Sequence, residues 1–301
     1  MSVAVVITAY NCGDFIAAAI ESALGQGANV VVVDDGSPDD AALKASMYPV
    51  TVLTGRKGGA CSARNAGAAV APPSDYILFL DGDDVLGPGM LCTLENYLDG
   101  HPDVGAAYCG SIAIGPDGAP LLDQRSSRVT RWRPTRWWVE AIPESQRLVP
   151  FESFFVHQSG MIASTTLVRR SVWGKLDGWD EDMQLPLEDN DMALQLSLVA
   201  DVHYLSARLL MKRDWSQQHS RSAVGFRRNA RKLATKWGDY GAGTTAVDRV
   251  RLSQQFRSRY QLAYRVRELR AAIAECNPKW AGLTILHLVR NLARYRPTLR
   301  P

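Results

Sequence analysis

Residues 76–84 read YILFLDGDD, an apolar run that stops in three carboxylates grouped around Gly82. A short apolar run of this kind is typical of a buried strand in a parallel sheet. Open α/β sheets bind ligands at the carboxyl ends of their strands, which is where this strand carries its acids. Hard divalent cations prefer such oxygen ligands. Asp81 and Asp83 are therefore candidate metal-site residues, although a polar turn that only ends the strand fits the same residues.

The preceding residues alternate short apolar runs with helical stretches. Strands are predicted at residues 3–7, 30–33, 50–53 and 76–80, and helices at about 14–24, after Pro38, and at 60–70. This spacing predicts right-handed βαβ units in an α/β fold with a doubly wound, mostly parallel sheet. No GxGxxG motif opens the first helix, so a dinucleotide-binding Rossmann site is not expected.

Polar side chains follow three of the predicted strands. They are Thr8, the pair Asp34 and Asp35, and the pair Asp81 and Asp83. The carboxyl ends of parallel strands meet at one edge of a sheet, so these side chains are expected to lie together. Carboxylates repel a bare diphosphate, so a nucleotide bound at this edge requires a divalent cation to mediate.

Four short motifs in order resemble the N-terminal half of family-2 glycosyltransferases with the GT-A fold. They are TAYN at 8–11, VDDGS at 33–37, ARNAG at 63–67 and FLDGDD at 79–84. The resemblance continues through 160–170, LDGWDE at 176–181 and LEDND at 187–191. It implies a GT-A domain at residues 1–220, with a donor half at about 1–110 and an acceptor half at about 111–220. Residues 221–301 form a separate basic segment that the resemblance does not cover.

The resemblance implies that a nucleotide-diphospho-sugar, with UDP favoured, binds at the strand ends. The implied donor-binding residues are Thr8, Ala9, Tyr10, Asn11, Asp34, Asp35, Lys57, Arg64, Asp81, Gly82 and Asp83. For the Asp34–Asp35 turn the alternative is a cap on the next helix, and for Tyr10 it is ordinary packing. Arg64 is expected to meet the donor, to pair with one of the clustered acids, or to do both.

The implied cofactor is Mn²⁺ or Mg²⁺, bound by Asp83 and bridging to the diphosphate. His219 is implied as a further metal ligand from a polar loop, but KRDW at 212–215 departs from the commoner Tyr-Arg-x-His pattern of the family. A solvent-exposed loop histidine is the alternative. For Asp84 the competing interpretation is a helix-capping or solvent-exposed residue.

Asp189 is the implied general base, because inverting transfer needs one carboxylate to remove the acceptor hydroxyl proton. The metal would act as Lewis acid on the leaving group. Adjacent residues on a helix do not share a face, so only one of Glu188 and Asp189 is expected to be the base. The alternative is an acidic helix N-terminus favoured by the dipole. Glu188 and Trp179 are the implied acceptor contacts, with a core tryptophan as the alternative for Trp179.

The charge is distributed unevenly along the chain. Residues 1–206 carry −13 and residues 207–301 carry +16, which together give the net +3. Residues 249–270 have the pattern of a basic amphipathic helix, which indicates peripheral binding of 221–301 to an anionic membrane surface. A homodimer interface and docking on the acidic body of a neighbouring subunit are the alternatives. No nucleic acid is expected, because no recognised binding motif accompanies the charge.

Arginine and tryptophan alternate through residues 125–138. This stretch lies between the donor and acceptor halves and is interpreted as a mobile lid, an acceptor-docking loop or a membrane-surface segment. A surface excursion without a role fits it as well.

The five cysteines are widely spaced without a CxxC pair, which favours reduced cytosolic thiols. The first residues are read as a strand rather than a signal peptide, and no stretch approaches the ~20 apolar residues that span a bilayer. The expected location is cytoplasmic, at the inner face of the membrane if the basic segment binds lipid.

The expected activity is transfer of a sugar to a saccharide or lipid-linked saccharide. A nucleotidyltransferase is the alternative within enzymes, but it would normally carry a Gly-rich basic loop directly after the first strand, and that loop is absent. A catalytically silent scaffold, with the basic tail as its function, is the alternative outside enzymes. The presence of both Asp83 and Asp189 argues against a silent site.

Overall fold

The computed structural model describes residues 2–55, 57–121, 160–183 and 185–215, with residues 148, 149, 154, 228, 229, 232, 233, 236 and 237. The chain divides into two units, residues 1–220 and 221–301. All helices and strands named below belong to the first unit. The predictions for 125–138 and His219 lie outside the described residues, as do those for nearly all of 221–301. Among the described helices, none has the length and apolar character to cross a bilayer.

The first unit begins with β1 (Val3–Ala9), α1 (Ile16–Leu24), β2 (Asn29–Asp34), α2 (Ala41–Ala45), β3 (Thr51–Thr54), α3 (Ala60–Val70) and β4 (Tyr76–Asp81). It continues with β5 (Val85–Leu86), α4 (Met90–Asp99), β6 (Val104–Ile114), the 3-10 helix η1 (Ala163–Thr165), β7 (Thr166–Arg169), α6 (Arg170–Trp173), α7 (Glu188–Val199) and β8 (Asp201–Arg213). The predicted strands and helices before residue 81 are all confirmed, with ends displaced by a few residues.

The strands form one eight-stranded sheet in the order β3-β2-β1-β4-β7-β6-β8-β5. The first four positions are parallel, as the βαβ pattern predicts. β7 runs antiparallel to both β4 and β6, and β5 runs antiparallel to β8, whereas β6 and β8 pair in parallel. The sheet is therefore mixed, with its parallel half at the N-terminal strands.

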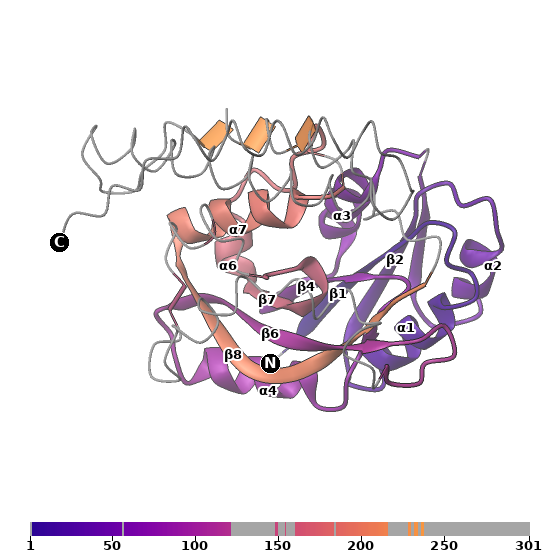
Figure 1. Ribbon diagram of the computed structural model, residues 1–301, viewed down its shortest axis with the longest axis horizontal. Helices are drawn as coiled ribbons and strands as arrows, with labels where there is room; N and C mark the ends of the chain where they lie inside the picture. The colour runs from indigo at the N-terminus through magenta and orange to yellow at the C-terminus, as the bar shows by residue number, and fades with distance from the viewer. Residues whose placement is uncertain are drawn as a thin grey trace, which may run out of the picture. The chain divides into compact units, whose positions relative to one another are not determined.

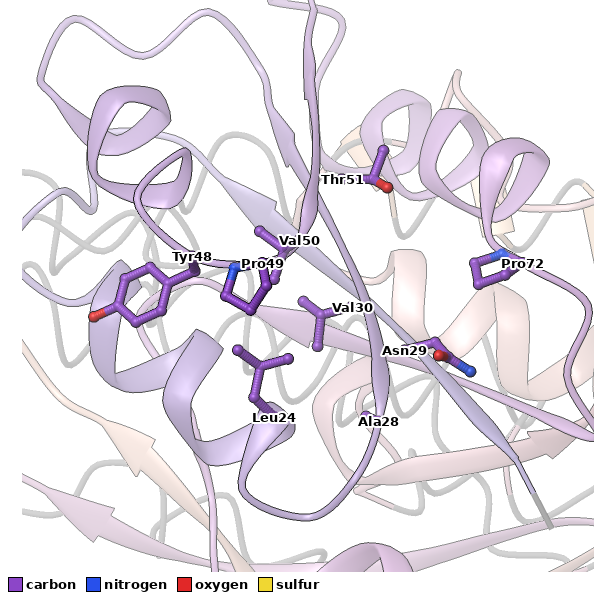
Figure 2. Close-up of a pocket in the computed structure, with 9 residues that line it drawn as sticks. All are labelled: Leu24, Ala28, Asn29, Val30, Tyr48, Pro49, Val50, Thr51 and Pro72. Atoms are coloured by element: carbon purple, nitrogen blue, oxygen red, sulfur yellow. The ribbon is translucent and has the colours of Figure 1, made fainter.

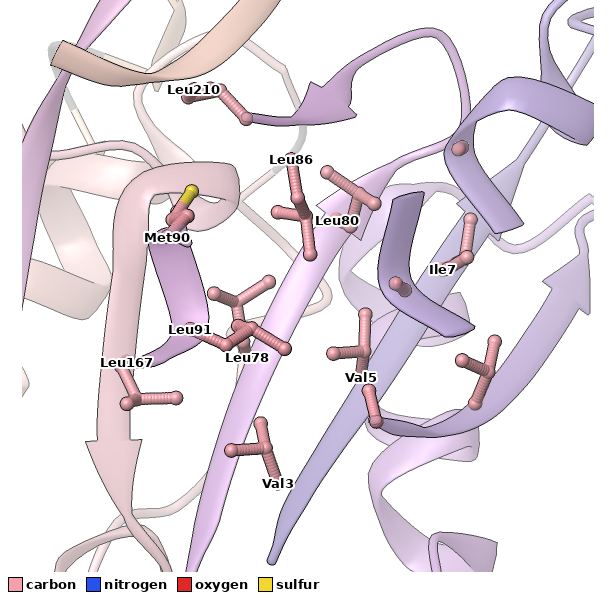
Figure 3. Packing of buried hydrophobic residues seen from close by; sticks show 14 of the residues in the cluster. Val3, Val5, Ile7, Leu78, Leu80, Leu86, Met90, Leu91, Leu167 and Leu210 are labelled. Atoms are coloured by element: carbon pink, nitrogen blue, oxygen red, sulfur yellow. The ribbon is translucent and has the colours of Figure 1, made fainter. Parts of the chain in front are cut away.

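Helices cover both faces of the sheet (Figure 1), with α1 and α4 on one face and α3, α6 and α7 on the other. Alternate residues of a strand point to opposite faces. On the first face Val5 and Ile7 of β1 pack beside Leu78 and Leu80 of β4, and Leu91 of α4 joins the same apolar cluster (Figure 3). Both faces of β1 and β4 are buried, which explains their continuous apolar sequences.

Helix α3 lies close against the opposite face of the sheet. A Cβ atom added at Gly67 would lie 2.3 Å from Cγ1 of Val6 and 2.9 Å from Cγ2 of Val33. Only glycine lets the helix backbone approach β1 and β2 this closely. This packing brings Arg64, one turn earlier on α3, toward the carboxyl ends of the central strands.

Candidate active site

The carboxyl ends of β1, β2 and β4 meet at one edge of the sheet. Thr8 is in register with Asp81, and Ala9 is in register with Asp34. The Gly82 N–H donates to the Thr8 carbonyl at 2.9 Å, and the Asp35 N–H donates to the Ala9 carbonyl at 2.9 Å. The structure therefore brings the residues predicted at three strand ends into one place.

The two carboxylates after β2 have different surroundings. Asp34 is buried, and its Oδ2 accepts from the Ser37 N–H at 3.3 Å, while its Oδ1 has no hydrogen-bond partner among the described residues. Asp35 accepts from the N–H groups of Gly58 and Gly59 at 2.6 and 2.7 Å. Asp35 therefore holds the loop before α3, whereas Asp34 keeps an acceptor oxygen for a ligand donor.

Tyr10 and Asn11 continue this edge beyond β1. Lys57 Nζ lies 5.0 Å from the centroid of the Tyr10 ring, and the Asn11 N–H donates to Ser37 Oγ at 3.2 Å. Asn11, Lys57 and Leu187 have φ angles of 52°, 54° and 94°, in the left-handed region that non-glycine residues rarely adopt. Such conformations cluster at functional sites, and all three lie in segments that the sequence assigned to the site.

The turn after β4 carries the acidic cluster. Ligand oxygens of Asp81, Asp83 and Asp84 all lie within 4.8 Å of one another. A Cβ atom at Gly82 would lie 2.9 Å from the Thr8 carbonyl oxygen and 2.8 Å from a cysteine sulfur, so the turn requires glycine. An all-oxygen carboxylate set is the donor chemistry that Mg²⁺ and Mn²⁺ take, and these residues fit such an ion.

Asp84 is fully buried, so its interpretation as a helix cap or solvent-exposed residue is wrong. Its carboxylate accepts from the Arg213 N–H at 3.0 Å and from Lys212 Nζ at 3.4 Å. Burial raises the pKa of Asp84 to about 7, and Lys212 opposes that rise while Asp83 and Asp81 add to it. Two chain segments distant in sequence therefore meet at this carboxylate, which the sequence pattern could not indicate.

Arg64 connects the acidic turn to the start of α7. Its side chain is 1% exposed, with NH2 2.8 Å from Asp81 Oδ1 and NH1 3.5 Å from Glu188 Oε1. Burial raises the pKa of Asp81, but the charges of Arg64 and Lys212 outweigh it and leave that pKa lowered. The predicted pairing of Arg64 with a clustered acid is confirmed.

Trp179 packs inside the protein. It is 3% exposed, its ring lies 5.4 Å from that of Phe79 in an edge-to-face arrangement, and the Arg64 guanidinium lies 4.4 Å from it. Asn65 accepts from the Trp179 N–H and donates to its carbonyl, both at 2.8 Å. This environment agrees with the alternative interpretation of Trp179 as a core tryptophan. The buried ring offers no open face to an acceptor in this structure.

Glu188 and Asp189 occupy the first turn of α7, where the sequence predicted a helix to begin. Asp189 is half-buried and its Oδ1 accepts from the Ala163 N–H at 2.9 Å. Burial raises the pKa of Asp189; the charge of Asp81 adds to this rise and Arg64 opposes it. Burial and the charge of Asp189 raise the pKa of Glu188 to about 8. The two acids share one electrostatic network with the acidic turn after β4.

Sequence reasoning did not single out four residues that build the site. Ser164 Oγ accepts from the Asp81 N–H at 3.1 Å, one residue after the Ala163 N–H that binds Asp189. Arg213 and Trp215 bind Asp83 from the end of β8. Lys212 binds Asp84. The sequence indicated KRDW only as a departure from the family pattern, although three donor side chains within four residues were a usable signal.

A cavity of about 430 Å³ lies elsewhere, at the amino ends of β2 and β3 (Figure 2). Its lining residues are Leu24, Ala28, Asn29, Val30, Tyr48, Pro49, Val50, Thr51 and Pro72. Asn29 and Val30 begin β2, whereas Asp34 ends it. The cavity is therefore at the other edge of the sheet from the candidate active site and is not part of it.

With this arrangement in place, the comparisons with known proteins identify the family. The family model described as glycosyl transferase family 2 matches residues 4–169, more than half of the chain. This chain belongs to glycosyl transferase family 2. The match includes Thr8, Asp34, Arg64 and Asp83 and stops before Asp189, so the family assignment rests mainly on the donor half.

Two curated relatives illustrate the similarity. The chondroitin synthase of Pasteurella multocida is 28% identical over 214 residues, which are 68% of this chain and 20% of that protein. The succinoglycan biosynthesis protein ExoO of Rhizobium meliloti is 40% identical over 131 residues, which are 41% of this chain and 35% of that protein. The chain thus spans about one fifth of the length of the chondroitin synthase.

Solved structures support the fold. Staphylococcus aureus TarS 1-349 in complex with UDP has a TM-score of 0.61 at 15% identity, over 97% of this chain and 89% of that chain. A Pyrobaculum calidifontis mannosyltransferase in complex with GDP-Man and Mn²⁺ has a TM-score of 0.59 at 17% identity, over 98% and 81%. The predicted GT-A type α/β fold is confirmed.

Proposed function

We propose that this chain is a metal-dependent inverting glycosyltransferase. It transfers a sugar from a nucleotide-diphospho-sugar, with UDP favoured, to a hydroxyl of a saccharide or lipid-linked saccharide. The observation that carries the proposal is the contact network from Asp81 through Arg64 to Glu188, which joins the acidic donor turn to the helix that bears Asp189. Inverting transfer requires a diphosphate site and one carboxylate base in a common site.

The names of relatives support the donor class. One Escherichia coli relative, 38% identical over 90 residues, is a UDP-Glc-dependent β-1,3-glucosyltransferase acting on a GlcNAc-diphosphoundecaprenol. TarS binds UDP in its crystal structure, and the mannosyltransferase binds GDP-Man and Mn²⁺. The unpartnered Oδ1 of Asp34 suits a nucleobase N–H or a ribose hydroxyl.

Asp83 is the proposed metal ligand in the acidic turn, with His219 as a further candidate outside the described residues. When bound, a divalent cation stabilises the negative charge that develops on the leaving diphosphate. Asp81 is held by Arg64 and is the proposed contact for the ribose or the donor sugar. Both oxygens of Asp84 accept hydrogen bonds from Lys212 and Arg213, so Asp84 is assigned a role in supporting the turn.

Asp189 is the proposed general base. Its carboxylate takes the proton of the acceptor hydroxyl as that oxygen attacks the anomeric carbon, and the bond from that carbon to the diphosphate oxygen breaks. The Ala163 N–H fixes one carboxylate oxygen, and the raised pKa makes the carboxylate a better proton acceptor near neutral pH. Glu188 is 3% exposed and serves to hold Arg64.

The test of the donor site is a thermal-shift panel of UDP-, GDP- and dTDP-sugars, each with and without Mn²⁺ or Mg²⁺. A ligand at 100 times its Kd stabilises the native state by about 2.7 kcal/mol, which raises the midpoint by roughly 5–10 °C in a domain of this size. We expect such a rise with UDP-sugars and only with the metal present. No rise with any donor would favour the scaffold alternative.

Asp189→Asn tests the base. The amide cannot accept the proton, so turnover is expected to fall about 10²–10⁴-fold while the metal-dependent donor shift is retained. Asp182→Asn, which removes an exposed acid from the same region, is the matched control and is expected to keep turnover. An Asp189→Asn variant with unchanged turnover would exclude Asp189 as base.

A further inference from the structure

Trp215 contacts the proposed metal ligand directly. Its indole Nε1–H donates to Asp83 Oδ2 at 2.8 Å. Indole nitrogen is a donor only and cannot bind a metal ion. Trp215 therefore acts on Asp83 through a hydrogen bond, and one of the two carboxylate oxygens is engaged by the protein before any ion arrives.

The geometry around Trp215 fixes the direction of this hydrogen bond. The Trp215 ring meets the Phe15 ring edge-to-face at 5.2 Å, and the Arg213 guanidinium lies 4.5 Å from the same Phe15 ring. Arg213 Nε donates to the Asp83 carbonyl at 2.9 Å, and its backbone N–H donates to Asp84. Packing on Phe15 therefore orients the Trp215 ring. The hydrogen bonds from Arg213 hold the acidic turn at the same end of β8.

A carboxylate that accepts a hydrogen bond on one oxygen keeps both lone pairs of its other oxygen for a ligand, which favours coordination through that other oxygen. Ca²⁺ takes six to eight oxygen ligands and accepts bidentate carboxylates, whereas Mg²⁺ needs a compact octahedral shell. Partners that orient a ligand typically change metal affinity by 10–100-fold.

We propose that Trp215 is a positioning residue that keeps Asp83 a one-oxygen ligand and so makes the site prefer small octahedral cations over Ca²⁺. This inference rests on the proposed metal dependence. It assigns a role to an aromatic residue that acts on the ion only through Asp83, because its indole N–H cannot coordinate a metal.

Trp215→Phe tests it, because the ring that packs on Phe15 is kept and the N–H is lost. Binding of Mn²⁺ in the presence of UDP is measured from the free-ion EPR signal, and Ca²⁺ affinity from its competition with Mn²⁺. We expect the Mn²⁺ Kd to rise about 10-fold or more. The Ca²⁺ Kd should change much less, because Oδ2 becomes available for bidentate binding, so the Mn²⁺ over Ca²⁺ preference falls.

Trp173→Phe is the matched control, since Trp173 packs on Phe79 and makes no hydrogen bond to the acidic turn among the described residues. It should leave both affinities unchanged. Phe15→Leu keeps the Trp215 N–H but removes the ring that orients it, and should shift the preference in the same direction by a smaller factor. Phe15→Leu therefore tests the same proposal if the Trp215→Phe variant does not fold.

The outcomes separate the two proposals. If the wild-type protein binds no Mn²⁺ with or without UDP, the proposed metal-dependent function fails. If the wild-type protein binds Mn²⁺ and Trp215→Phe binds it equally well, only the role of Trp215 is overturned. Equal losses of Mn²⁺ and Ca²⁺ affinity would also overturn it, because a general disturbance of the turn does not change selectivity.

Discussion

Arg64 is a buried cation that serves more than one carboxylate. Its shorter contact is to Asp81 at 2.8 Å and its longer one is to Glu188 at 3.5 Å. The charge of Asp189 also raises the pKa of Arg64. A buried charge without compensation is strongly destabilising, so one guanidinium cannot support three ionised acids at equal strength. The protonated form of Glu188 relieves this imbalance, which agrees with its pKa of about 8.

This proton makes stability depend on pH. The folded-state pKa of Glu188 lies above its unfolded value. The contribution of Glu188 to the free energy of unfolding is therefore fully present below about pH 4.5 and is lost as pH rises through about 8. For the metal-free protein we expect Glu188 to account for a fall of about 1 kcal/mol in the free energy of unfolding between pH 7 and pH 9.

Glu188→Gln is the variant that isolates this effect, because the amide is uncharged at every pH. Denaturant unfolding at pH 7 and pH 9 should give a smaller decline for the variant than for the wild-type protein. Glu181→Gln, at an exposed position, serves as control. An equal decline in wild-type and Glu188→Gln proteins would show that Glu188 is already ionised at pH 7.

At the scale of elements, the approach of α3 to the sheet positions Arg64. Glycine inside a helix costs roughly 0.5–1 kcal/mol relative to alanine, so its presence needs a compensating gain. The gain that offsets this cost is the close packing of the helix backbone at Gly67 against Val6 and Val33. A shift of α3 away from the sheet would move Arg64 away from Asp81.

Gly67→Ala sets these two effects against each other. The gain in helix propensity is at most about 1 kcal/mol, while overpacking a core typically costs about 1–3 kcal/mol. We expect a net loss of about 1–2 kcal/mol of stability, measured by denaturant unfolding. Ala66→Val, on the exposed side of the same helix, should change stability by less than about 1 kcal/mol. A stabilised Gly67→Ala variant would contradict the close packing.

Helix α7 and η1 form a second functional unit at this scale. Ala163 binds Asp189 and Ser164 binds the backbone of Asp81, so a single short turn touches both the proposed base and the acidic turn. Backbone N–H groups and buried hydroxyls fix such distances more firmly than long exposed side chains. These two hydrogen bonds therefore join α7 to the acidic turn through η1, in addition to the connection made by Arg64.

At the scale of the whole molecule, charge separates along the chain. The body up to residue 206 carries −13 and the remainder +16. We predict that the full chain binds anionic lipid through its basic segment, because clustered basic residues are attracted to anionic surfaces by about 1 kcal/mol each near the membrane. A homodimer interface stays the alternative prediction for the same residues.

Co-sedimentation with liposomes measures this directly. The full chain should pellet with vesicles that contain anionic phosphatidylglycerol, and binding should weaken as salt rises because the Debye length shortens. Neutral phosphatidylcholine vesicles are the control. Absence of binding to anionic vesicles at moderate salt, together with a dimer by light scattering, would assign the segment to self-association.

The sequence by itself determined the strands and helices of the N-terminal half and the position of its acids at the strand ends. Continuous apolar runs predicted the strands because parallel strands are buried on both faces, and acids directly after them predicted the ligand edge. Short motifs carried the family resemblance because they lie at strand ends, where local sequence and site coincide. The acids at 188–191 also indicated a helix N-terminus, and α7 begins there.

Only the tertiary structure decided the contacts between segments distant in sequence. Asp84 is buried because β8 returns to it with Lys212 and Arg213, more than 120 residues later. Trp215 faces Asp83 because of that same pairing. Local patterns record periodicity and propensity, whereas burial and partner choice depend on which strands become neighbours. The antiparallel β7 and the return of β8 fix those neighbours, and with them the electrostatics of the site.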